Sequence, residues 1–270
     1  MRPSERCPLF HHEVDAPSAF RPEELLGAVR AIKGLPDLSV PPICVLDFDG
    51  DLTDWLVNHA KAAAFEPWAC FHTQMYRVEA EGISCGIIAR TIGGPYAVLI
   101  AEQLRVSGAQ LILGLTSAGR ISPTLRLPSL VVVTSALRDE GTSLHYLPAS
   151  EQISCPTPIG DLLMEELVQL GLTVVQGSVW TTDAPYRETR QQPQRHAASG
   201  VLAVEMQAAS LFAFATACQV NIGIVAHLTN GVDHQDEQFD KGTDEDSFAI
   251  LTAILRAGRM YLEGASIRNG

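Results

Sequence analysis

Residues 43–48 read ICVLDF, and five more short runs of similar character follow along the chain: ISCGIIA (83–89), LILGL (111–115), LVVVTSA (130–136), LTVVQG (172–177) and VNIGIVAHL (220–228). Most of these runs are continuously apolar, which is typical of buried strands. Helical patterns lie between them at 95–107, 159–170, 206–218 and 246–263. This alternation predicts an α/β fold with a mainly parallel or mixed sheet covered by helices on both faces, and ligands at the carboxyl ends of its strands.

Length and composition indicate one globular domain. The chain has 270 residues, of which 46% are hydrophobic, and a mean hydropathy of +0.11, so it can bury a sizeable core. Residues 1–42 are rich in proline and contain one helical pattern that opens at Pro22, which predicts an N-terminal arm. The strand and helix alternation continues without a break afterwards, so we expect a single domain over residues 43–270.

Charge and cysteine usage narrow the classes of partner. Asp and Glu outnumber Lys and Arg by 31 to 19, giving a net charge of -12, which disfavours nucleic acid and anionic membranes as partners. A small molecule is the better expectation. The six cysteines form no CxxC pair and several lie in apolar runs, as reduced thiols do, so a cytoplasmic location is expected. Polar residues interrupt the longest apolar stretch, residues 201–228, so no membrane span is expected.

Two candidate site segments follow predicted strands. LGLTSAG (113–119) brings the hydroxyls of Thr116 and Ser117 and several backbone N–H groups to the sheet edge, which suits an anion or a polar nucleophile. AHLTNG (226–231) brings His227 and Asn230, and the Asn amide can both donate to and accept from a heterocycle. Taken singly, each segment is more typical of an ordinary turn, and a histidine at a strand end is more often structural.

Two further segments carry polar or aromatic side chains. In GVLAVEMQAAS (200–210), Glu205 and Gln207 flank Met206 at a helix start, where they could bind vicinal hydroxyls while the sulfur packs on a sugar. An acid at a helix N-terminus is, however, common for electrostatic reasons alone. In WTTDAPYR (180–187), Trp180 or Tyr186 could stack on a planar base, or the segment could be a solvated loop.

The order and spacing of these segments resemble the nucleoside phosphorylase superfamily of the purine nucleoside and uridine phosphorylase type. The resemblance runs from residue 43 to the end of the chain. It is carried by GGPYAVLIAEQL (93–104), TSAGRISPTLRLPSLVVV (116–133), RDEGTSLHYLP (138–148), TTDAPYRET (181–189) and VLAVEMQAASLFAFA (201–215). It implies a three-layer αβα sandwich around a central twisted mixed sheet, assembled as a homodimer or a trimer of dimers.

The resemblance also implies a reaction and a role for each segment. The family cleaves the N-glycosidic bond of a nucleoside through a cation-like sugar transition state, without a metal or an organic cofactor, and phosphate is the co-substrate in phosphorylases. Met206 would pack against the ribose, Gln207 would hold its hydroxyls, and Glu205 matches an acid of the family. Ser117, with Thr116 beside it, would contact the acceptor, and Asn230, with assistance from His227, would hold the base.

Three departures from the family pattern leave the acceptor open. Gln207 replaces the usual glutamate, and Gly114 and Asp54 stand where phosphorylases have phosphate-binding arginines. Phosphorolysis then needs a cation from elsewhere, for which the candidates are Arg77, Arg90 and Arg120.

TSAG also resembles the Ser-Ala-Gly loop of methylthioadenosine nucleosidases, in which the acceptor is water. In that reading Asp49 or Asp51 would serve as general base. We therefore predict a nucleoside phosphorylase first and a nucleosidase second. A family member repurposed for binding or for a different reaction is the third reading.

Overall fold

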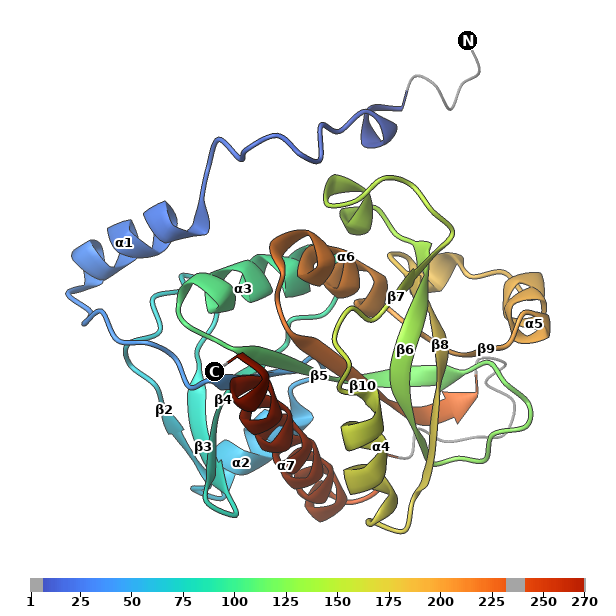
Figure 1. Cartoon of the computed structure of the whole chain (residues 1–270). Helices are drawn as coiled ribbons and strands as arrows, with labels where there is room; N and C mark the ends of the chain where they lie inside the picture. Colours follow the sequence, from blue (N-terminus) through green and yellow to red (C-terminus); the bar gives the residue numbers. More distant parts are fainter. Residues whose placement is uncertain (1–6, 232–240, 270) are drawn as a thin grey trace.

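The structure is a computed structural model that describes residues 7–231 and 241–269. Within these residues, ten strands form one mixed sheet and helices pack on both of its faces (Figure 1). The predicted α/β sandwich around a mixed sheet is confirmed. The strands are β1 (Ile43–Asp47), β2 (Ala62–Ala64), β3 (Tyr76–Ala80), β4 (Ile83–Ala89), β5 (Leu111–Arg120), β6 (Ser129–Asp139), β7 (Gln152–Ser154), β8 (Thr173–Thr182), β9 (Val201–Glu205) and β10 (Ile222–Gly231).

The sheet has an open half and a closed half. The order β10-β6-β8-β9-β5-β1-β4-β3-β2 runs across it, and β10 pairs in addition with β5. Strands β5, β10, β6, β8 and β9 therefore form a ring, whereas β1, β4, β3 and β2 continue outward from β5 as an open sheet. Strand β5 belongs to both halves, because it pairs with β1, β9 and β10 along its length.

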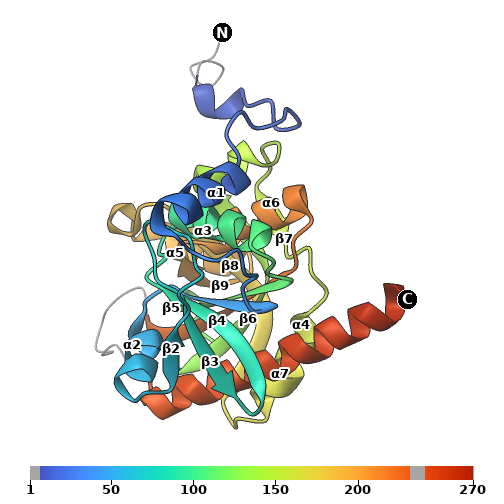
Figure 2. The ribbon, with the colours of Figure 1, turned by 90° about the vertical axis from the view of Figure 1, so that its left-hand side faces the viewer.

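Helices cover both faces of the sheet, as predicted. They are α1 (Pro22–Lys33), α2 (Asp51–Asn58), α3 (Gly94–Val106), α4 (Gly160–Val168), α5 (Gln191–Ala198), α6 (Ala208–Cys218) and α7 (Asp244–Asn269), with short 3-10 turns η2 (Pro8–Phe10), η3 (Thr142–His145) and η4 (Pro185–Arg187). Successive β1 side chains point to opposite faces. Leu46 shares a buried cluster with residues of α3 and α6, and Val45 shares one with residues of α2, α4 and α7. Figures 1 and 2 show these two helix layers.

All six strands and all four helices expected from the apolar patterns are present, but three segments expected as loops are strand. Residues 116–119 continue β5, residues 229–231 continue β10, and residues 180–182 continue β8. Pairing explains the extension of β5, because Gly119 lies between Asn230 of β10 and Val204 of β9. The candidate side chains of these segments are therefore held by strand pairing, more rigidly than a turn would hold them.

The N-terminal arm contains the expected helix. Helix α1 opens with Pro22 in its first turn and ends at Gly34, whose φ of 65° suits glycine. Leu26 and Val29 on its inner side are buried against Ala69. The division into an arm and a single domain at residue 43 stays a prediction. Among the described residues, no helix has the length and apolarity needed to cross a membrane.

Candidate functional site

A buried carboxylate shapes the loop that begins the site. Asp47 ends β1, and its Oδ2 accepts hydrogen bonds from the backbone N (2.8 Å) and the hydroxyl (2.7 Å) of Thr53, while its Oδ1 accepts one from Gly50 N (3.2 Å). Asp47 therefore caps the first turn of α2. Burial raises the pKa of Asp47, although these hydrogen bonds lower it. The cap fixes the short turn that carries Asp49 and Asp51 to the carboxyl edge of the sheet.

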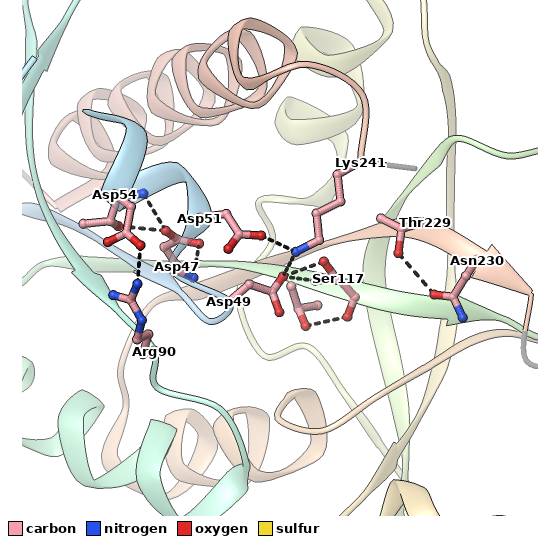
Figure 3. Close-up of polar contacts among 12 residues, drawn as sticks. Asp47, Asp49, Asp51, Asp54, Arg90, Ser117, Thr229, Asn230 and Lys241 are labelled. Carbon is pink, nitrogen blue, oxygen red and sulfur yellow. Dashed lines mark hydrogen bonds and ion pairs between the residues drawn. The ribbon is translucent and has the colours of Figure 1, made fainter. Parts of the chain in front are cut away.

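Asp49 is the centre of a polar cluster at this edge (Figure 3). Its Oδ2 accepts hydrogen bonds from Ser117 N (3.1 Å) and Ser117 Oγ (2.5 Å), and lies 3.4 Å from Lys241 Nζ. Lys241 also pairs with Asp51 at 2.6 Å. Burial lowers the pKa of Lys241, but its hydrogen bonds and ion pairs with Asp51 and Asp49 outweigh this and raise it. Lys241 is therefore a cation at neutral pH.

These residues line a small cavity of about 60 Å³. Its polar lining residues include Thr116, Ser117, His227 and Lys241, together with Asp47, Asp49 and Asp51. Small-molecule sites usually enclose roughly 300–1,000 Å³, whereas one water takes about 30 Å³ in the liquid. The cavity therefore has room for a small polar acceptor but not for a whole nucleoside. We call it the acceptor cavity.

The sheet brings the predicted segments next to one another. His227 of β10 lies opposite Ser117 of β5, and Asn230 lies opposite Gly119. On the other side, Gly119 pairs with Val204 of β9, directly before Glu205. Of the candidates Ser117, Met206 and Asn230, only Ser117 is among the residues that line the acceptor cavity.

Gln207 connects the start of α6 to the acceptor cavity. It is the N-cap residue of α6, is 2% exposed, and its Nε2 lies 3.5 Å from Thr116 Oγ1. Its Oε1 is buried and has no hydrogen-bond partner within the described residues. A buried acceptor without a donor is costly, so this oxygen is suited to a hydroxyl of a bound ligand.

Glu205 is buried at the start of α6 and is fully engaged in hydrogen bonds. Its Oε1 accepts a hydrogen bond from Thr181 Oγ1 (2.5 Å), and its Oε2 accepts from Gln207 N (2.7 Å) and Ala208 N (2.9 Å). The side chain is 4% exposed and caps the start of α6. Burial raises the pKa of Glu205 from 4.5 to about 7, against the three hydrogen bonds. These contacts match the helix-capping alternative considered from the sequence, and a contact of Glu205 with ligand stays a prediction. Met206, beside it, is half-buried.

The aromatic candidates lie apart from the acceptor cavity. Trp180 is fully buried, its Nε1 donates to Asp139 Oδ2 (3.0 Å), and its ring packs 4.6 Å from the ring of His196. It therefore has no free face for a base, which corrects the expectation, because β8 turns this side chain into a small apolar cluster. Tyr186 in η4 is 99% exposed and contributes nothing to the cavity in this chain. Asn230 is 7% exposed, and among the described residues its side chain hydrogen-bonds only to Thr229 and Gly231.

The three arginines considered for phosphate lie outside the acceptor cavity. Arg90 pairs with Asp54, Arg77 pairs with Glu79, and Arg120 donates to the carbonyl of Leu125. A side chain at Gly114 has no space, since its Cβ would lie 2.9 Å from the ring of Phe48. No arginine lines the cavity within the described part of the chain, and its lysine, Lys241, was not found from the sequence.

The aspartates of the site could be recognised in the sequence, whereas Lys241 could not. Asp47, Asp49 and Asp51 alternate at the end of a predicted strand, a pattern that points to a polar edge. Nothing local marks Lys241, which reaches the site from a segment far along the chain, directly before α7. Across residues 7–231 and 241–269, no three His, Cys, Asp or Glu side chains are placed to hold a metal ion.

Comparison with known proteins assigns the family. The sequence model of the phosphorylase superfamily matches residues 42–257. The chain belongs to the phosphorylase superfamily. The resemblance found in the sequence is thereby confirmed, and so is the expectation of a nucleoside phosphorylase-type enzyme at the level of this family. The match begins one residue before the predicted domain boundary and includes all the segments of the site described above.

Individual members of the superfamily are more distant. A guanosine phosphorylase of Halorubrum lacusprofundi is 28% identical over 186 residues, which cover 64% of this chain and 76% of that protein. A uridine phosphorylase of Salmonella typhimurium is 24% identical over 204 residues, 68% of this chain and 79% of that protein. An uncharacterized protein of Acanthamoeba polyphaga mimivirus is 36% identical over 102 residues, but these span only 38% of either chain.

A solved structure shares the fold. The crystal structure of purine nucleoside phosphorylase from Toxoplasma gondii, in complex with immucillin-H, superimposes with a TM-score of 0.71 at 18% identity. The superposition covers 85% of this chain and 95% of that one. At this identity the likeness supports the architecture, and the chemistry has to be argued from the residues of this chain.

Proposed function

We propose that this protein cleaves the N-glycosidic bond of a nucleoside and transfers the sugar to inorganic phosphate. The observation that carries the proposal is the buried, unpartnered Oε1 of Gln207, a residue whose amide contacts Thr116 of the acceptor cavity. Thr116 links the two, because its hydroxyl lies 3.5 Å from Gln207 Nε2 and its neighbour Ser117 lines the cavity. A sugar held by Gln207 would present its anomeric carbon toward an acceptor at Ser117.

The proposed chemistry assigns a task to each group. Gln207 Oε1 accepts a hydrogen bond from a sugar hydroxyl, and Met206 packs on the sugar ring. The Asn230 amide holds the departing base without ionising, so it stabilises the leaving group by hydrogen bonding and not by proton transfer. The acidic loop around Asp49 favours positive charge developing on the sugar. The neutral Gln207 supplies less of this stabilisation than a glutamate would.

Hydrolysis is the second candidate, and the position of Asp49 favours it. Both candidate bases, Asp49 and Asp51, line the acceptor cavity, but Asp49 accepts a hydrogen bond from Ser117 and lies 3.4 Å from Lys241 Nζ, whereas Asp51 pairs with Lys241 at 2.6 Å. A carboxylate that lines a small cavity with room for water can take a proton from an attacking water. The same enzyme would then release base without phosphate. The general base of this candidate is therefore Asp49.

Base release from a panel of purine and pyrimidine nucleosides, with and without phosphate, tests both candidates. Release that requires phosphate supports phosphorolysis, and equal release without phosphate supports hydrolysis. Gln207→Ala should raise KM for the nucleoside about tenfold through loss of a buried hydrogen bond, whereas the exposed Gln169→Ala should leave it unchanged. Nucleoside binding without any release would point to the repurposed member of the family.

Assembly, location and cofactor use complete the proposal. We propose a homodimer or a trimer of dimers, located in the cytoplasm, that uses phosphate but neither a metal nor an organic cofactor. The large apolar side chains Phe71, Ile92 and Leu99 are exposed in the single chain, which supports assembly. All six cysteines are free, which supports a reducing compartment. Light scattering on the purified protein measures the assembly directly.

A further inference from the structure

The donors around Asp49 have the geometry of an oxyanion site. Ser117 N, Ser117 Oγ and Lys241 Nζ converge on a single oxygen, Asp49 Oδ2, at 3.1, 2.5 and 3.4 Å (Figure 3). A backbone N–H, a hydroxyl and an ammonium group directed at one point are what proteins use to bind oxygen anions. In this chain the anion at that point is one of the protein's own side chains.

Lys241 has a second partner that keeps it in place. Its Nζ lies 2.6 Å from Asp51 Oδ2, so the ammonium group stays at the cavity when Asp49 moves away. About a third of the Asp49 side chain, 32%, is exposed to solvent, so its carboxylate can be hydrated when it leaves Ser117. The anchor and the movable carboxylate are therefore separate groups.

The cations considered for phosphate binding elsewhere in the chain are absent from this cavity or engaged by other residues. The ring of Phe48 fills the space beside Gly114, and Arg90 is engaged by Asp54. Building on the proposed function, we infer that Ser117 and Lys241 form the phosphate-binding pocket and that Asp49 is a built-in competitor which phosphate must displace. Lys241 is then the residue that determines whether phosphate can serve as acceptor. Asp49 determines how tightly phosphate binds.

The inference predicts opposite effects for two neighbouring substitutions. Asp49→Asn removes the competing charge and the repulsion between carboxylate and phosphate, so phosphate should bind about tenfold more tightly than to wild type. Lys241→Met removes the cation, so phosphate should bind at least about tenfold more weakly. Lys241→Met combined with Asp49→Asn should lose most of the gain of the single Asp49 variant.

Isothermal titration of each full-length variant with inorganic phosphate, at constant ionic strength and pH 7.5, measures these effects. Lys33→Met in α1 is the control, because it removes one lysine charge away from the cavity and should leave the Kd unchanged. Asp49→Ala serves as a second variant if Asp49→Asn has a lowered melting temperature. Unchanged phosphate affinity in the Asp49 variants, or full affinity in Lys241→Met, would overturn the inference.

The titration needs no turnover, so it separates this inference from the proposed function. Phosphate binding that follows the predicted order, without base release from any nucleoside, would contradict the proposed function alone. Phosphate-dependent base release with the same KM for phosphate in wild type, Asp49→Asn and Lys241→Met would contradict the inference alone. Where both hold, the KM for phosphate should fall in Asp49→Asn and rise in Lys241→Met.

Discussion

Glu205 couples the start of α6 to pH through one buried carboxyl group. Its oxygens accept hydrogen bonds from Thr181, Gln207 and Ala208, and burial still raises its pKa from 4.5 to about 7. Between these values the folded state keeps a proton that the unfolded chain has released. The unfolded state binds fewer protons there, so the free energy of unfolding should fall as pH rises through this window.

Replacing Glu205 with glutamine tests this linkage. The new amide can accept the two backbone N–H bonds with its oxygen and donate to Thr181 with its nitrogen, so Glu205→Gln should fold. It should flatten the fall of stability between pH 4.5 and about 7. Urea denaturation at several pH values measures the slope, with the exposed Glu165→Gln as control. A slope as steep as in wild type would show that other groups cause it.

At the scale of elements, Gly114 of β5 allows close packing of the Phe48 ring, which directly follows β1. A Cβ there would lie 2.9 Å from Phe48 Cε2 and 3.3 Å from Ile224 Cγ1. The absence of a side chain lets the Phe48 ring, which is fully buried, pack directly against β5. The same packing leaves no space for an arginine side chain at this position, so under the proposed function the cation at the acceptor cavity has to come from another segment.

Gly114→Ala should therefore destabilise the protein by about 1–3 kcal/mol through overpacking. In a Phe48→Ala background the same substitution should cost less, because its main obstacle is gone. Gly27→Ala in α1 is the matched control: its Cβ would meet nothing within 4 Å, and alanine favours a helix, so it should be neutral or slightly stabilising. Chemical denaturation gives all four values, and equal costs of Gly114→Ala in both backgrounds would contradict the packing argument.

Strands and helices with continuous apolar patterns could be predicted from the sequence. The pairing of strands and the contacts between distant side chains could not. Strand β4 begins and ends at the predicted residues, because its apolar run is bounded by polar ones. Strand β5 runs past its apolar part through Ser117, because partners far along the chain pair with it. Helix α2 has eight residues and depends on the Asp47 cap, so it has little pattern of its own. Lys241 reaches Asp49 only through the fold.

At the scale of the whole molecule, one part of the N-terminal arm packs against the domain, and the other part contributes little to stability. Helix α1 buries Leu26 and Val29 against Ala69. Of residues 7–21, the segment around η2 contacts η3, and the ring of His12 lies 3.9 Å from the ring of His145. The burial at α1 is apolar and the rest is largely exposed. Stability should depend on the helix more than on the residues before it.

Deleting residues 1–20 should leave the melting temperature nearly unchanged. Leu26→Ala in the full chain should cost about 2–4 kcal/mol, because the leucine is 1% exposed and its loss leaves a cavity. Ile32→Ala, on an exposed position of the same helix, is the control and should have little effect. Thermal unfolding of the three variants decides the matter. A large loss on deletion would mean that the first segment is part of the domain.

The closed ring of β5, β10, β6, β8 and β9 limits how copies of this chain can join. Within the described residues, most ring strands have a partner on both sides, although residues 173–177 of β8 pair only with β6. The edge strands β2 and β7 have three residues each. Edges this short offer little template for a foreign strand. If protomers associate as proposed, we expect side-chain surfaces, more than strand pairing, to join them.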